Sequence, residues 1–181
     1  MNRIRCLALL GVLVVLDTGA GQAQDKKIAA IPVKYEGLKE EILKQRGKVV
    51  IVDFWATNCP PCRAAFHKFV KMHKDHENKG VIVISVSLDK LNRDADESDD
   101  EFQKRNAALP QQIDKFLTDQ QANMRNLWLK DPSVDWTKKL GSLSIPCYFV
   151  FDRQGRWVRF SGNSIDYAEI ERTALRMVDE K

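Results

Sequence analysis

The sequence has no long apolar run, no block of basic residues and few cysteines, and each lack excludes a class of protein. Its 181 residues include nine Gly, six Pro and four Cys, and 44% are hydrophobic. This composition excludes collagen-like, disordered and disulfide-scaffold proteins. The 29 Lys and Arg exceed the 25 Asp and Glu by only four, and they form no run or basic stripe, so we expect no binding to nucleic acid.

The first 23 residues are typical of a secretory signal. A basic start precedes an eleven-residue apolar run, Cys6 to Leu16, and small residues stand three and one positions before a cleavage point ahead of Gln24. The run is shorter than the roughly 20 residues that cross a bilayer. We therefore predict a signal peptide over 1–23 and an exported domain over 24–181, periplasmic or secreted, with no stable membrane span after cleavage. A buried helix or an uncleaved anchor is the alternative.

The rest of the chain predicts a single α/β domain with a central mixed sheet flanked by helices. Lys48 to Phe54 is a nearly continuous β-branched run, which indicates a central strand covered on both faces. The acidic stretch from Asp94 to Glu101 is interpreted as a solvated loop. The predicted strands cover about 31–35, 48–54, 81–88, 124–129, 147–151 and 156–160, and the predicted helices about 38–45, 59–77, 109–121 and 165–178.

Cys59 and Cys62 stand where a buried strand meets a helix. At the helix N-terminus the sulfur of Cys59 meets unpaired N–H groups and the positive end of the helix dipole, which favour the attacking thiolate. Cys62 lies one turn further along, on the apolar face. The spacing therefore predicts an exposed attacking cysteine and a shielded resolving cysteine, the two roles that thiol–disulfide exchange requires.

Asp53 lies inside the predicted central strand. Burial raises the pKa of a carboxyl group toward values useful for proton transfer. We assign Asp53 the role of accepting the proton of Cys62, directly or through water. A structural aspartate that caps nearby backbone is the alternative.

Zinc sites use the same cysteine spacing and would recruit His73 and His76 here. Only two residues separate these histidines, fewer than the usual three to five, and no hairpin precedes the helix. We therefore expect no metal, and no cofactor other than the redox-active disulfide of Cys59 and Cys62.

Two segments resemble the active site of the thioredoxin fold: VDFWATNCPPC, and Ser144-Ile145-Pro146-Cys147 with the following strand YFVFD and turn DRQGR. The predicted signal and an inserted segment, about 90–142, are similar to the exported TlpA/ResA-like thiol–disulfide oxidoreductases. The resemblance implies a thioredoxin-like fold whose insertion lies between the second core strand and a cis-proline loop.

The resemblance also implies roles for individual residues. Cys59 matches the nucleophile, Cys62 the resolving cysteine and Asp53 the buried carboxylate. Pro146 matches the cis-proline, with Ile145 beside it binding an extended substrate segment. Trp55 would line the site, with a core aromatic as the alternative. Asn58 and Ala65 depart from the usual Trp and Glu, so chemistry assigned to that Glu is not carried over.

Cys147 directly follows Pro146, so we expect it close to Cys59 or Cys62. It is either a small buried residue at the start of a strand or a third redox thiol.

The predicted function is an exported thiol–disulfide oxidoreductase that reduces disulfides in other exported proteins. The resemblance implies a thiol electron donor in the membrane that restores the reduced pair. A peroxide reductase is one alternative, although Ala56 stands where the peroxidatic pattern has Thr. A thioredoxin-like binding module without redox turnover is the other.

Overall fold

A computed structural model describes residues 27–89, 96–131, 138–141, 144–162 and 164–180. The predicted signal peptide lies outside these ranges, as do parts of the predicted insertion. No helix within them is long and apolar enough to cross a membrane.

The centre of the fold is a six-stranded mixed sheet in the order β1-β4-β3-β2-β5-β6. β1, β4, β3 and β2 run parallel to one another, and β5 runs antiparallel to both of its neighbours, β2 and β6. The strands are β1 (Ile31–Val33), β2 (Val49–Trp55), β3 (Val81–Ser87), β4 (Arg125–Leu129), β5 (Cys147–Phe151) and β6 (Trp157–Ser161). The predicted mixed α/β sheet is confirmed, and every residue of the central strands β2 and β3 is buried.

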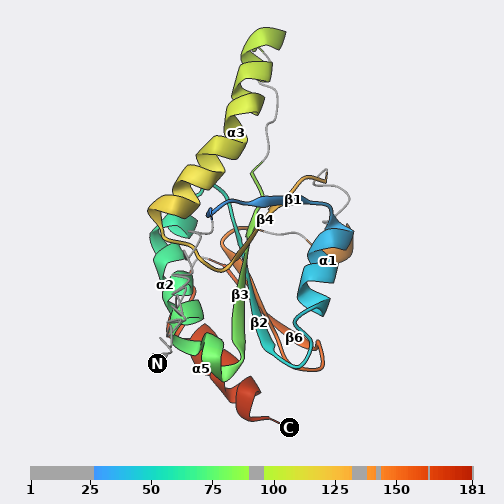
Figure 1. The fold of residues 1–181 in the computed structure, drawn as a ribbon, viewed down its shortest axis with the longest axis vertical. Coiled ribbons are helices and arrows are strands. Elements are labelled where there is room, and N and C mark those ends of the chain that lie inside the picture. The colour runs from blue at the N-terminus through green and yellow to red at the C-terminus, as the bar shows by residue number, and fades with distance from the viewer. Residues whose placement is uncertain (1–26, 90–95, 132–137, 142–143, 163, 181) are drawn as a thin grey trace, which may run out of the picture.

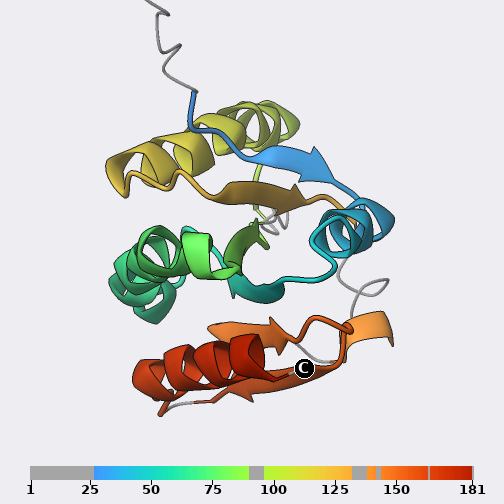
Figure 2. The same cartoon turned by 60° about the horizontal axis from the view of Figure 1, so that its bottom comes forward.

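Helices cover both faces of this sheet (Figures 1 and 2). Helix α1 (Tyr35–Leu43) packs on one face, and α2 (Pro60–His76), α3 (Asp99–Asp119) and α5 (Tyr167–Asp179) pack on the other. Side chains of β2 alternate between the two layers. Val50, Val52 and Phe54 belong to the layer under α1, whereas Val49, Ile51 and Trp55 belong to the layer under α2. This alternation decides which residues of the central strands reach the cysteines.

Helix α3 is longer than predicted, because it begins at Asp99 and not near Leu109. The expectation of a loop is therefore wrong for residues 99–101, although these residues are exposed as expected. Ser98 and Glu101 form a capping box in which each side chain bonds the backbone N–H of the other. The acidic side chains in the first turn also stabilise the helix, because they lie at the positive end of its dipole. The first half of α3 projects beyond the rest of the described chain (Figure 1).

The predicted insertion contributes more than a cover for the sheet. Its described part contains α3 and β4, and β4 pairs with β3 on one side and with β1 on the other. After β6, helix α5 returns to the face that carries α2. The site described below lies at the junction of β2 and α2.

Candidate active site

Cys59 and Cys62 occupy the start of α2, as predicted. Cys59 is the N-cap residue, and the two sulfurs are joined in a disulfide with the Cα atoms 5.3 Å apart. The backbone N–H of Cys62 donates to Sγ of Cys59 over 3.3 Å. Pro60 and Pro61 fill the first two helical positions, where a backbone N–H has no partner within the helix. The helix can therefore start directly after the first cysteine.

Both cysteines are buried in the oxidised protein, so Cys59 is not exposed as predicted, but it is the less buried of the two. Cys59 retains 8% of its accessible surface and Cys62 only 2%. Cys62 packs in the core layer together with Phe66 and Phe69, further along the same helix. Of the two sulfur-bearing side chains, Cys59 is therefore the more accessible from outside, and Cys62 is the more deeply buried.

Asp53 is buried in β2, and it faces the layer that holds the cysteines. Its neighbours Ile51 and Trp55, two residues away on either side, both belong to that layer, and alternate residues of a strand share a face. Burial raises the pKa of Asp53 well above the usual carboxyl value. Its Oδ1 accepts no hydrogen bond from the described residues. Because no backbone N–H of the described chain donates to this oxygen, the structure does not support a capping role for it, and the proton-transfer interpretation is favoured.

Tyr148 forms part of the surroundings of Asp53. The two residues are paired across β2 and β5, and Tyr148 stacks on Phe69 of α2 with ring centroids 4.5 Å apart. Burial, followed by the nearby charge of Asp53, raises the pKa of Tyr148. Tyr148 is therefore a neutral neighbour, which supplies no positive charge to stabilise an ionised Asp53.

The loop between β2 and Cys59 is held by Asp89, which the sequence analysis did not identify. The Asp89 carboxylate accepts from the Thr57 backbone N–H over 2.9 and 3.0 Å and from the Thr57 hydroxyl over 2.5 Å. It also accepts from the Ser87 hydroxyl over 2.7 Å. The available signal was an acidic residue directly after the second buried strand, where it follows a Ser-Leu pair.

Replacing Asp89 by alanine is expected to lower the free energy of unfolding of the oxidised protein by about 2–4 kcal/mol. The reason is that three donors around a buried carboxylate lose their acceptor at once. Urea unfolding followed by circular dichroism measures the loss. Asp89→Asn, which keeps one acceptor oxygen, is the matched variant and should lose less. A loss below about 0.5 kcal/mol in Asp89→Ala would contradict this account of the loop.

Ile145 and Pro146 lie beside the cysteine pair, on a hollow of about 230 Å³. The peptide bond between them is cis. The hollow is lined by Pro61, Ser144, Ile145, Pro146, Gly162, Ile165 and Tyr167. Because Pro61 directly precedes Cys62, a chain segment lying in this hollow passes next to the disulfide. The structure thus brings the two sequence segments of the predicted site together.

Trp55 was expected to line this site, but the structure places it in the core. Its side chain is completely buried, and its ring centroid lies 5.1 Å from that of Phe66 and 4.7 Å from that of Phe116. The prediction that it contacts substrate is therefore wrong for this structure. The reason is that the odd-numbered residues of β2 point beneath α2, so Trp55 supports the helix from below.

Cys147 was expected near the cysteine pair, and this expectation is also wrong. It is the first residue of β5, it is paired with Phe54, and its side chain lies in the layer under α1. The sheet therefore separates it from Cys59 and Cys62, because successive residues of a strand point to opposite faces. Burial raises the pKa of the Cys147 thiol, which further reduces its reactivity. This placement fits the small buried residue and not the third redox thiol.

Replacing Cys147 by alanine is accordingly expected to leave the reduction potential and the trapped disulfide products unchanged. Mass spectrometry of alkylated protein, equilibrated in a glutathione redox buffer, measures both. The appearance in the parent protein of a disulfide that involves Cys147 would contradict the separation by the sheet.

His73 and His76 lie at the far end of α2 from the cysteines. Nδ1 of His73 accepts from the backbone N–H of Val83 over 3.4 Å, and Nε2 of His76 lies 2.6 Å from Oε1 of Glu171. Within the described ranges, no three His, Cys, Asp or Glu residues are placed to hold a metal ion together. The two histidines and the cysteine pair do not form one site.

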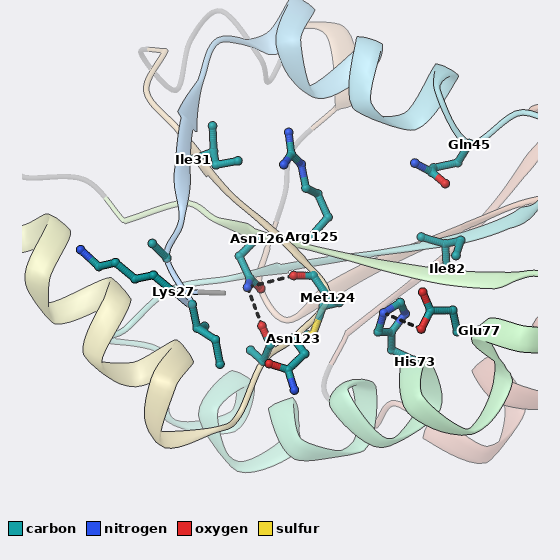
Figure 3. Close-up of a pocket in the computed structure, with 13 residues that line it drawn as sticks. Lys27, Ile31, Gln45, His73, Glu77, Ile82, Asn123, Met124, Arg125 and Asn126 are labelled. Atoms are coloured by element: carbon teal, nitrogen blue, oxygen red, sulfur yellow. Dashed lines mark hydrogen bonds and ion pairs between the residues drawn. The ribbon is translucent and has the colours of Figure 1, made fainter. Parts of the chain in front are cut away.

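A larger hollow of about 490 Å³ lies at this far end (Figure 3). His73 and Glu77 border one side and Lys27 the other. The side-chain amide of Asn126 donates to the backbone carbonyl groups of Ala122 and Met124. None of the predicted site residues lines this hollow. Although it is larger than the hollow beside Pro146, it therefore takes no part in the chemistry of the cysteine pair.

Comparison with known proteins agrees with this geometry. The sequence model of the AhpC/TSA family matches residues 30–159. The thiol–disulfide oxidoreductase ResA of Oceanobacillus iheyensis is 30% identical over 112 residues, which cover 55% of this chain and 58% of the relative. The sporulation thiol–disulfide oxidoreductase A of Bacillus subtilis is 32% identical over 88 residues, which cover 45% and 51%. The chain thus spans about half the length of these curated relatives.

Solved structures give the same result for the fold. A putative thiol:disulfide interchange protein DsbE from Chlorobium tepidum is 26% identical, with a TM-score of 0.55 over 76% of this chain and 84% of that chain. A secreted thiol–disulfide isomerase from Corynebacterium glutamicum is 20% identical, with a TM-score of 0.56 over 77% and 75%. The predicted thioredoxin-like fold is confirmed.

Proposed function

The chain belongs to the AhpC/TSA family, and we propose that within it the protein is an exported thiol–disulfide oxidoreductase that reduces disulfides in other exported proteins. The observation that carries this proposal is the cysteine pair at the start of α2, with the more exposed Cys59 ahead of the shielded Cys62. Relatives that are themselves named thiol–disulfide oxidoreductases support it. The signal-like features of residues 1–23 support export.

The reaction follows from the order of exposure. The thiolate of Cys59 attacks one sulfur of the substrate disulfide, forms a mixed disulfide and releases the other substrate sulfur as a thiolate. Cys62 loses its proton and attacks Sγ of Cys59, which closes the Cys59–Cys62 disulfide and releases the second substrate sulfur. Two electrons pass from the protein to the substrate, whose two sulfurs end as thiols. The pair carries these electrons itself, so the cycle uses no further cofactor.

Asp53 serves the second attack in this proposal. Because burial raises the pKa of Asp53 well above the usual carboxyl value, its carboxylate is a stronger base than an exposed one and is suited to accept a proton. The proton comes from Cys62, which shares the layer under α2 with Asp53, either directly or through one water molecule. Transfer to a buried acceptor lets Cys62 become a thiolate without exposure to solvent.

Two further parts complete the proposed cycle. The hollow beside Pro146 receives an extended segment of the substrate. A thiol donor in the membrane returns two electrons to the oxidised pair, because outside the cytoplasm no glutathione pool reduces it. This donor is proposed from the resemblance to the exported oxidoreductases.

The two alternative functions receive less support. A peroxide reductase would use a threonine hydroxyl close to its cysteine, but Ala56 occupies the expected position, and the hydroxyl of the adjacent Thr57 is bonded to Asp89. A binding module without turnover would have no use for a buried carboxyl group on the side of the sheet that carries its disulfide, where an unpaired polar group costs stability.

The direction of electron flow is tested by the reduction potential of the mature protein. We expect a two-electron Cys59/Cys62 couple closer to about −270 mV, the value of thioredoxin, than to about −120 mV, the value of a strong disulfide-forming oxidant. Equilibration with glutathione or dithiothreitol, followed by alkylation, measures it. A potential near about −120 mV would reverse the proposed direction of electron flow. The absence of a reversible couple would favour the binding module.

A further inference from the structure

Helix α2 exposes a basic face that begins directly after the cysteine pair. Arg63, His67, Lys71 and Lys74 are exposed and follow one another at spacings of four, four and three residues, so they share one side of the helix. Lys68 is exposed beside them. No Asp or Glu occurs between Cys59 and Lys74.

This face corrects the sequence analysis, which found no basic stripe. The basic residues are interrupted in the sequence by apolar ones, and only the folded helix separates the two sets. Phe66, Phe69 and Met72 turn into the core, while the basic side chains remain exposed on the outer side of the helix. We call Arg63, His67, Lys68, Lys71 and Lys74 the basic face of α2.

Two aromatic rings hold cations of this face near the site. The guanidinium of Arg63 lies 5.7 Å from the ring centroid of Phe116, and Nζ of Lys68 lies 4.2 Å from that of Tyr167. Such contacts stabilise a cation over a ring without neutralising it. Tyr167 also lines the hollow beside Pro146. The basic face and the hollow therefore meet at this tyrosine.

The neighbouring acidic side chains already have partners. On α2 itself, Asp75 pairs with Lys71. On α5, which lies beside α2, Glu171 contacts His76, and Glu169 and the N-cap residue Asp166 both pair with Arg172. On α3, Asp119 pairs with Lys115, and Asp114 accepts from the backbone N–H of Ala30. Within the described residues, Lys71 is the only member of the basic face that forms an ion pair with an acidic side chain.

We propose that the basic face of α2 is the docking surface for an acidic polypeptide, and that the disulfide substrates carry acidic residues beside the bond that is reduced. The second half of this inference rests on the proposed function. A polypeptide is favoured over other anions because the face runs into a hollow that a single chain can enter. A flat bilayer surface does not enter such a hollow.

Binding of cysteine-free peptides tests the docking surface without any redox step. Two fluorescent peptides of equal length, one with four Glu and one with four Lys, are titrated with the oxidised protein, and binding is followed by fluorescence anisotropy. The acidic peptide is expected to bind at least about tenfold more tightly at low salt. This preference should shrink as ionic strength rises from about 0.01 to 0.15 M, because the Debye length falls from about 30 to about 8 Å.

A charge-reversal variant and a matched control locate the effect. Lys68→Glu/Lys71→Glu/Lys74→Glu should prefer the basic peptide. Lys39→Glu/Arg46→Glu/Lys48→Glu changes the net charge equally, at exposed positions outside α2, and should keep the preference for the acidic peptide. Equal binding of the two peptides to the parent protein, or a preference that survives in the α2 variant, would overturn the proposal.

Turnover then tests the substrate class. The same two peptides, each with an added intramolecular disulfide, are reduced by each variant, and each rate is divided by the rate of that variant with the neutral hydroxyethyl disulfide. The parent should favour the acidic substrate, and equal ratios for both would overturn the claim about substrates. Failure to reduce hydroxyethyl disulfide would instead refute the proposed function, while the binding experiment still decides the docking surface.

A last experiment compares the binding of other anions. Anionic phospholipid vesicles and a single-stranded oligonucleotide are compared with neutral vesicles and with the two peptides. Binding to either anion that depends on Lys68, Lys71 and Lys74, without a preference between the peptides, would assign the face to that partner and overturn the proposal.

Discussion

Replacing Cys59 by serine is expected to reduce the turnover of disulfide substrates to below about 0.1% of the parent rate, because the attacking sulfur is removed and a hydroxyl does not exchange with disulfides. Replacing Cys62 by serine should have a different result. The first attack still occurs, but the mixed disulfide at Cys59 has no sheltered thiol to resolve it, so the complex accumulates.

A disulfide peptide of known mass separates these outcomes. After incubation with the reduced protein and acid quenching, intact mass spectrometry should show an adduct of one peptide on Cys62→Ser and none on Cys59→Ser. Cys147→Ala is the matched control for loss of a buried thiol on the other face of the sheet, and it should turn over like the parent. An adduct of similar yield on Cys59→Ser would show that the order of exposure, 8% against 2%, does not set the order of attack.

Replacing Asp53 by asparagine is expected to slow the resolution of the mixed disulfide about a hundredfold near neutral pH. Asparagine has a similar shape but cannot accept the proton of Cys62, and general base catalysis contributes at least about this factor. Stopped-flow mixing of the reduced protein with a disulfide peptide measures attack and resolution separately. The first attack should be much less affected. Equal slowing of both steps would indicate a structural role for Asp53.

The same substitution should stabilise the oxidised protein, and the gain should grow with pH. The pKa of Asp53 is raised in the folded state, so the unfolded chain releases this proton first, at a pH of about 4. The parent therefore loses stability as the pH rises from there toward the folded-state pKa. Since each unit of pKa shift corresponds to about 1.4 kcal/mol, we expect Asp53→Asn to exceed the parent by more than about 1 kcal/mol at pH 8.

Urea unfolding at pH 4, 6 and 8 measures this difference. Asp179→Asn removes an exposed carboxylate at the end of α5 and should show no comparable trend. A difference between Asp53→Asn and the parent that stays constant over the three pH values would show that burial does not disfavour the charged form of Asp53.

The sequence analysis identified the elements whose signal is a run of similar residues close together in the chain. The strands β2 and β3 were found within one residue of their ends, because their β-branched runs are unbroken and both faces are buried. The cysteine pair was assigned from its place between such a strand and a helix. These features depend on neighbours in the chain.

The features that the sequence analysis missed depend on which way a side chain points, or on distant partners. Trp55 and Cys147 were placed at the site because they adjoin its motifs, but strand alternation turns one into the core and the other to the opposite face. Asp89 contacts Thr57, which lies 32 residues earlier in the chain. The early start of α3 depends on a capping box that was read only as a group of charges.

The pairing of β1 has a consequence for how the protein folds. Ile31 lies opposite Leu127, so β1 joins the sheet only by bonding to β4, which lies 96 residues later in the chain. At a synthesis rate of about 5–20 residues per second, β1 leaves the ribosome at least about 5 s before its partner. The segment that contains α3 and β4 must take up its place before the edge of the sheet can close. Truncation after β3 should therefore leave β1 without a partner, and the N-terminal part of the chain should remain open to proteases.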